Sequence, residues 1–210
     1  RYGGYILSFN GGQIINAQTG EVIYQKTLPL DTPALLYDMS REYGTNIMTY
    51  LDETVITPKK GDRYVELESR INKMEVREVA NFKSFVNFPV TKCLMVGDGD
   101  YLAEVEQKVK ARLGGRLSVL RSEPFFLEVM PQNIDKAYSL GKLLEHLGLD
   151  REQMVACGDG FNDRSMIEFA GLGVAMANAQ EPVRSAADHV TASNDEDGVA
   201  MVVERFILGE

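Results

Sequence analysis

The spacing of hydrophobic residues changes along the chain and sets its carboxyl-terminal part apart from the middle. From residue 135 onward, helix-like stretches alternate with short apolar stretches at 154–157, 173–176 and 189–191. The last helix is expected over about 196–208. Strict alternation of this kind is typical of βαβ units, whose strands form a parallel sheet. The pattern therefore predicts an α/β fold for this part of the chain.

The middle of the chain lacks this alternation. Helices are expected at 33–43 and 101–113, because their apolar residues recur on one helical face. The other elements expected there are strands at 47–51, 55–56, 92–96 and 117–120, and the ambiguous stretch 62–77 is interpreted as a helix plus a loop. A strand is expected at 5–9, a hairpin of 13–15 and 22–25 is expected next, and another strand is expected at 125–130. We interpret 28–122 as an α+β module inserted into an α/β core made of residues 1–27 and 123–210.

The net charge and the distribution of apolar residues make some classes of binding partner unfavourable. The formal net charge of −9 disfavours binding to nucleic acids and to anionic membranes. No run of about 18 apolar residues occurs, so no membrane-spanning helix is predicted. A phosphorylated small molecule remains a plausible partner, because one local cation can dominate a site on an acidic surface.

Cysteines and histidines give little support to nucleophilic chemistry. Cys93 and Cys157 lie in apolar, strand-like stretches without zinc-type spacing. Free buried thiols in a reducing compartment, the cytoplasm, are favoured over a single disulfide. His146 and His189 are far apart in the sequence, so a Ser-His or Cys-His arrangement is disfavoured.

A cluster of polar residues follows the expected strand at 154–157. Asp159, Asn162 and Asp163 would lie at the carboxyl edge of a parallel sheet, where open α/β sheets bind ligands. Two carboxylates so close repel each other unless a cation or hydrogen-bond donors offset their charge, and a hard ion such as Mg²⁺ fits. A capped surface turn explains the same residue types. The local sequence leaves both readings open.

Lys136 lies in the first turn of an expected helix, where positive partial charge already collects. A lysine there suits a bound phosphate, although a solvated surface lysine is equally compatible with the local sequence. Asp98-Gly99-Asp100 and Asp195-Glu196-Asp197-Gly198 lack the later oxygen ligands of a calcium loop. We interpret both as turns or helix caps.

Several motifs, in this order and spacing over essentially the whole chain, resemble the haloacid dehalogenase-like phosphatases and their Cof-type capped sugar-phosphatase branch. The matching stretches are Phe9-Asn10-Gly11-Gly12, Phe126-Leu127-Glu128-Val129 with Asp135-Lys136, Gly158-Asp159-Gly160-Phe161-Asn162-Asp163, Gly171-Leu172-Gly173-Val174-Ala175-Met176-Ala177-Asn178-Ala179 and Asn194-Asp195-Glu196-Asp197-Gly198-Val199-Ala200. The resemblance implies a Rossmann-like parallel-sheet core with an inserted α+β cap.

It also implies Mg²⁺-dependent hydrolysis of a small phosphorylated metabolite, such as a sugar phosphate, through an aspartyl-phosphate. By this resemblance Lys136 steadies the phosphoryl group and the nucleophile, and Asp159 binds Mg²⁺. Asp163 supports the metal from behind its direct ligands or binds it through water. Asn162 and Asn10 contact phosphate or substrate.

The family pattern begins with a strand ending in Asp-x-Asp-Gly-Thr or Ser, which supplies the nucleophile and the general acid. A second strand supplies a phosphate-binding Ser or Thr. Neither motif occurs in this chain. We therefore expect an amino-terminal segment to be missing, two strands to be absent between residues 5–9 and 154–157, and self-association through the incomplete sheet. The alternatives are a remnant that binds metal or phosphate without turnover, and a phosphomutase.

Overall fold

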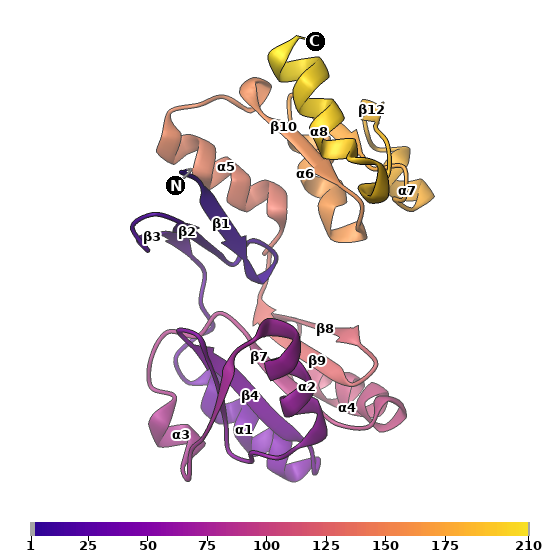
Figure 1. Ribbon diagram of the computed structural model, residues 1–210. Coiled ribbons are helices and arrows are strands. Elements are labelled where there is room, and N and C mark those ends of the chain that lie inside the picture. Colours follow the sequence, from indigo (N-terminus) through magenta and orange to yellow (C-terminus); the bar gives the residue numbers. More distant parts are fainter. Residues whose placement is uncertain (1–2, 210) are drawn as a thin grey trace. The chain divides into compact units, whose positions relative to one another are not determined.

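A computed structural model describes residues 3–209 and shows two compact units, and Figure 1 labels most of their helices and strands. Unit 1 is built from Arg1–Gln25 and Ile134–Glu210, and unit 2 is the continuous stretch Lys26–Asn133. One unit is thus inserted into the other. The two ends of unit 2 meet, because Nζ of Lys26 donates a hydrogen bond to the carbonyl oxygen of Asn133 at 3.4 Å.

Unit 2 is a six-stranded sheet with helices on both faces. Its strand order is β6-β5-β4-β7-β9-β8, and only the β5–β6 pair is parallel. The strands are β4 Asn46–Leu51, β5 Thr54–Thr57, β6 Glu75–Glu78, β7 Cys93–Val96, β8 Leu117–Glu123 and β9 Phe126–Pro131. The helices are α1 Thr32–Glu42, α2 Arg63–Asn72, α3 Phe82–Phe85 and α4 Gly99–Leu113.

Alternation along the strands divides the core of unit 2 between the two faces of the sheet. On one face, α1 and α4 contribute the fully buried side chains of Leu36, Met39, Leu102, Val105 and Val109. Leu35 of α1, on the face expected to be buried, is only partly buried against the same cluster. On the other face, α2 covers a second apolar cluster formed by Met48, Val55, Val65, Leu94, Val96 and Phe126. The ambiguous stretch 62–77 is therefore mostly helix, followed by the edge strand β6.

The observed boundary of unit 2 differs from the expected one. The sequence pattern places residues 123–133 in the core, but β9 pairs antiparallel with both β7 and β8 and is an inner strand of the unit 2 sheet. Val129 lies opposite Cys93 on one side and Val119 on the other. Every residue of β9 is buried. The inserted unit therefore runs from Lys26 to Asn133 rather than from 28 to 122.

Unit 1 contains two three-stranded sheets. In the first, β1 Tyr5–Ser8, β2 Gln13–Asn16 and β3 Val22–Gln25 are antiparallel. In the second, β10 Val155–Gly158, β11 Leu172–Ala175 and β12 His189–Val190 are parallel, as the alternating pattern predicted. Within residues 3–209, β1 pairs only with β2, so the strand expected at 5–9 does not join the parallel sheet.

The helices of unit 1 connect and flank these sheets. The long helix α5 packs against β2, β3 and the following helix α6, which in turn contacts β10 and β11. The bounds are α5 Lys136–Leu147, α6 Arg164–Phe169, α7 Glu181–Arg184 and α8 Gly198–Val203, the last continued by a π-helical turn over Glu204–Leu208. Within residues 3–209, no helix has the length and apolar character needed to cross a bilayer.

Candidate active site

An ion pair links α5 to the loop that follows β10. The Lys136 ammonium donates to Oδ1 of Asp163, and the side chains are 25% and 9% exposed. The other carboxylate oxygen, Oδ2, accepts hydrogen bonds from the backbone N–H groups of Asp159 at 3.1 Å and Gly160 at 3.0 Å. Both oxygens of Asp163 are therefore engaged by the protein itself.

The short loop after β10 folds back on itself because two positions have no side chain. A Cβ added to Gly158 would lie 2.4 Å from Cβ of Asp163, and one added to Gly160 would lie 2.6 Å from Oδ1 of Asn162. These distances are far below any real contact. Glycine at both positions lets the Asp163 carboxylate reach the backbone N–H groups of its own loop.

Opposing effects set the charge of Asp163. Burial acts to raise the pKa of this carboxyl, but hydrogen bonds from Lys136 and from the backbone of Gly160 and Asp159 outweigh burial and lower its pKa. Asp163 is therefore ionised at neutral pH and holds the Lys136 ammonium at the end of the sheet.

A second contact ties the first loop of the chain to this one. Nδ2 of Asn162 donates to Oδ1 of Asn10 at 3.1 Å. Asn10 has φ of 54° and Phe9 has φ of 53°, a left-handed backbone that residues other than glycine seldom adopt. Such strain persists only where surrounding contacts enforce it. Here the buried Ser139 hydroxyl of α5 donates to the carbonyl oxygen of Gly11.

The structure thus brings together all five candidate residues chosen from the sequence: Asn10, Lys136, Asp159, Asn162 and Asp163. It also shows a residue that was not chosen. Nδ2 of Asn178, in the loop after β11, donates to Oδ2 of Asp159 at 2.9 Å. The only sequence signal for Asn178 was its place in a motif that follows a strand of the same parallel sheet.

The acidic loop is suited to a hydrated hard cation. Asp159 is exposed, and among the described residues no hydrogen bond reaches its Oδ1. Asp163 has no free oxygen for direct coordination. Within residues 3–209 no group of three or more His, Cys, Asp or Glu side chains gathers. Mg²⁺ commonly binds through one or two carboxylates and keeps several waters, so Asp159 with water fits this ion.

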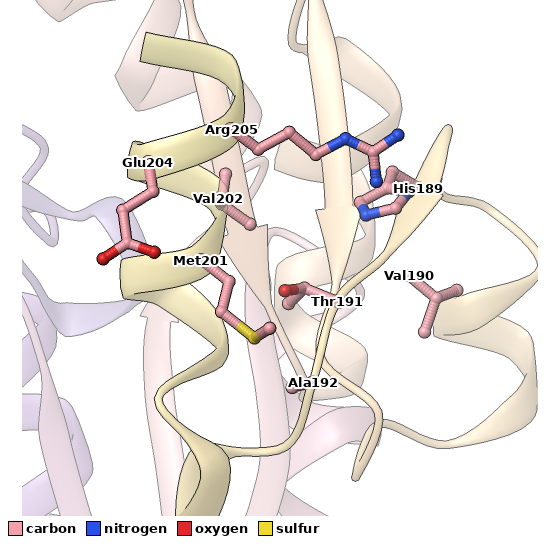
Figure 2. Close-up of a pocket in the computed structure, with 8 residues that line it drawn as sticks. All are labelled: His189, Val190, Thr191, Ala192, Met201, Val202, Glu204 and Arg205. Carbon is pink, nitrogen blue, oxygen red and sulfur yellow. The ribbon is translucent and has the colours of Figure 1, made fainter. Parts of the chain in front are cut away.

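A separate concavity of about 520 Å³ lies beside the carboxyl-terminal helix (Figure 2). The His189 ring and the Arg205 side chain lie on the same side of it, and His189 also contacts the Phe206 ring at 5.3 Å between centroids. None of the five candidate residues lines this pocket. His189 therefore belongs to a different surface from the acidic loop.

Comparison with known proteins identifies the class. A sequence profile for haloacid dehalogenase-like hydrolases matches residues 2–203. A crystal structure of a haloacid dehalogenase-like hydrolase from Bacteroides thetaiotaomicron is 50% identical, with a TM-score of 0.93, over 98% of this chain and 77% of that chain.

Two curated phosphatases are more distant relatives. The 5-amino-6-(5-phospho-D-ribitylamino)uracil phosphatase YcsE of Bacillus subtilis is 30% identical, over 97% of this chain and 73% of its own length. The HMP-PP phosphatase of Escherichia coli is 27% identical, over 89% of this chain and 67% of its own length. The chain belongs to the haloacid dehalogenase-like hydrolases. The resemblance stated from the motifs and the predicted α/β fold class are thereby confirmed.

Proposed function

We propose that this site serves the Mg²⁺-dependent hydrolysis of a phosphate monoester of a small metabolite, such as a sugar phosphate. The observation that carries the proposal is the Lys136–Asp163 ion pair beside Asp159 at the carboxyl end of β10. The site combines a fixed cation with an exposed carboxylate. The phosphatases YcsE and HMP-PP phosphatase are named for small phosphorylated metabolites, which supports this class of substrate.

Each residue has a distinct part in the proposed chemistry. Lys136 offsets negative charge on the phosphoryl oxygens, because its ammonium is held in place by Asp163 before the substrate arrives. Asn162, with Asn10 as its partner, offers an amide to phosphate or substrate. Asp159 would hold Mg²⁺, and Asp163 would support the ion through water. When bound, Mg²⁺ supplies further positive charge against the phosphoryl oxygens.

A specific observation favours a second candidate function. Formation of an aspartyl-phosphate needs a carboxylate that attacks phosphorus and releases the alcohol oxygen, which takes up a proton. Asp163 is fully hydrogen-bonded, Asp159 is the proposed metal ligand, and no third acidic side chain joins them within residues 3–209. The second candidate is therefore a module that binds metal and phosphate without turnover.

Two measurements on the same protein separate these functions. The first is phosphate release from a panel of sugar phosphates with Mg²⁺, for the chain and for Lys136→Ala. The second is calorimetric binding of inorganic phosphate in the presence of Mg²⁺ by the same two proteins. Lys142→Ala is the matched control, because Lys142 lies on the same helix but pairs with Glu145 instead of the acidic loop.

The outcomes are distinct. Hydrolysis predicts phosphate release that Lys136→Ala lowers by at least about 100-fold, since catalytic groups act as a unit. Binding without turnover predicts phosphate affinity that depends on Lys136 but no release above the uncatalysed rate. Equal behaviour of the chain, Lys136→Ala and Lys142→Ala in both assays contradicts both functions.

The cysteines, the net charge and the sheet edges bear on the compartment and the partners of the protein. Cys93 and Cys157 are free, and burial raises the pKa of the Cys93 thiol to about 12. Inert, unpaired thiols support a reducing compartment, and we place the protein in the cytoplasm. The net charge of −9 argues against nucleic acid and anionic membranes as partners. Within residues 3–209, β1 and β10 are edge strands of their sheets, and such edges would support self-association.

A further inference from the structure

A chain of hydrogen bonds links the exposed Asp159 carboxylate to a distant acidic turn. Nδ2 of Asn178 donates to Oδ2 of Asp159 at 2.9 Å. Oδ1 of Asn178 accepts from the backbone N–H of Asn194 at 3.1 Å. Asn178 therefore bridges the loop after β10 to the turn that follows β12.

The direction of the Asn178 amide is chemically fixed. A backbone N–H can only donate, so the group facing Asn194 must be the amide oxygen. The NH₂ group then faces Asp159, whose ionised carboxylate can only accept. No flipped arrangement of the amide satisfies both partners. The bridge thus presents a donor, and never an acceptor, to Asp159.

The Asn194 N–H is itself held by a local motif. The Ser193 hydroxyl and backbone N–H both donate to Oε2 of Glu196, at 2.7 and 3.2 Å. The backbone N–H groups of Glu196 and Gly198 both donate to the carbonyl oxygen of Ser193, each at 3.1 Å. These contacts form a closed turn over Asn194–Glu196. For Asp195-Glu196-Asp197-Gly198 the sequence predicts a turn or a helix cap.

We propose that Asn178 is a positioning residue that holds the Asp159 carboxylate in one orientation, with Oδ2 occupied and Oδ1 free to face a cation. The inference rests on the proposed metal role of Asp159. The acidic turn of Ser193–Glu196 acts through Asn178, as the support that sets the direction of its amide. Hydrogen bonds to a metal-binding carboxylate commonly change metal affinity by about 10- to 100-fold.

Substitutions at both ends of the bridge test this role. Asn178→Ala removes the donor to Asp159, and Asn178 is exposed, so the fold is expected to tolerate the change. Asn194→Pro removes the backbone N–H together with the side-chain amide, which donates to Oδ1 of Asp195 at 3.2 Å, and Asn194→Ala removes that same amide. Proline suits this first position of a short helix, and Ser193 before it already has φ −72° and ψ 170°, as proline requires. Asn194→Ala is the matched control, because it retains the N–H.

Two measurements decide the outcome. Calorimetric titration with Mg²⁺ should show affinity lowered about 10-fold by Asn178→Ala, lowered in the same direction by Asn194→Pro, and unchanged by Asn194→Ala. Structures of crystals grown without metal should show one Asp159 rotamer in the parent chain and in Asn194→Ala. They should show a displaced or multiple rotamer in Asn178→Ala.

Failure of the positioning role of Asn178 can be distinguished from failure of the metal role of Asp159. If Asp159→Asn leaves Mg²⁺ affinity unchanged, or if the parent chain binds no Mg²⁺, the metal role of Asp159 fails, and the metal-free crystal structures alone decide the positioning role. If Asp159→Asn weakens binding while Asn178→Ala does not, the positioning role is overturned. A single, unchanged Asp159 rotamer in Asn178→Ala overturns it as well.

Discussion

At the scale of single residues, Asp163 organises the site more than any other side chain. It lies almost fully buried, pairs with Lys136 and accepts two backbone hydrogen bonds from its own loop. A carboxylate held in this way stabilises the fold only while it is ionised. The pH dependence of stability should therefore report on it.

We predict that Asp163→Asn lowers the free energy of unfolding by about 1–3 kcal/mol at neutral pH, the usual effect of losing hydrogen bonds at a buried polar group. The pKa of Asp163 is lower in the folded state than its ordinary value of 3.8. Its contribution is therefore complete above the unfolded pKa and is lost as pH falls through the lower folded pKa. Urea unfolding between about pH 2 and pH 7 measures the difference.

The control for this prediction is Asp52→Asn, because Asp52 is an exposed carboxylate in a turn of unit 2. Its unfolding free energy should follow that of the parent chain throughout. A stability difference for Asp163→Asn that stays constant from neutral pH down to full protonation would contradict the linkage to ionisation.

Site residues can be predicted from the sequence where their charge and their place next to a predicted strand or helix single them out. Asp159, Asn162, Asp163 and Lys136 stand out because strand ends and helix starts collect such groups. Asn178 does not stand out, because an asparagine in a loop is ordinary and its two partners come from separate loops. The same limit applies to the role of Asp163, since its hydrogen bonds depend on how the loop folds back.

At the scale of elements, helix starts are marked by acidic caps that can be read from the sequence. The Asp98 side chain accepts from the backbone N–H of Asp100 at 3.3 Å and begins α4, while Asp100 lies within the first turn. This confirms the interpretation of Asp98-Gly99-Asp100 as a helix cap. The two aspartates should therefore differ in their contributions to stability.

We predict that Asp98→Ala lowers the free energy of unfolding by about 1 kcal/mol, through loss of the cap. Asp100→Ala should lower it by only about 0.3–0.5 kcal/mol, through the helix dipole. The ion pair of Asp98 with Arg63 adds little, because both side chains are largely exposed and 3.8 Å apart. Urea denaturation measures both variants, and equal effects would contradict the capping role.

Elements whose hydrophobic residues show no clear periodicity are harder to predict from the sequence. The strand β6 has the sequence Glu-Val-Arg-Glu and is mostly exposed, because it forms one edge of its sheet. With a single apolar residue in four, β6 cannot be told from a charged loop by its sequence. The amphipathic helices α1 and α4 and the hairpin of β4 and β5 carry strong periodicity, and the structure confirms them.

At the scale of the whole molecule, unit 2 is a continuous stretch between the two parts of unit 1, and it ends at Asn133, whereas the sequence pattern predicts an end at residue 122. The apolar stretch of β9 is buried on both faces, and this is also typical of a parallel core strand. Pairing partners cannot be read from such a stretch. Only the antiparallel bonds to β7 and β8 show that it belongs to unit 2.

We predict that a fragment of residues 26–133 folds by itself, because it contains both apolar clusters and every strand of its sheet. Circular dichroism of the fragment should show one cooperative urea transition, and the amide resonances in its NMR spectrum should be well dispersed. The matched control is the fragment 26–122, which lacks β9 and leaves β7 and β8 without their common neighbour. It should not fold. Cooperative folding of 26–122, or none of 26–133, would contradict the boundary.

The hydrogen bond between Lys26 and Asn133 has a consequence for the order of folding events. If unit 2 were still unfolded, bringing together the two stretches that form unit 1 would require closing a flexible loop of roughly a hundred residues, at an entropic cost of about 4 kcal/mol. Once unit 2 is folded, its ends are adjacent and most of this cost is already met. Early folding of unit 2 should therefore speed the assembly of unit 1, and mutations that weaken unit 2 should slow the formation of the candidate site without touching it.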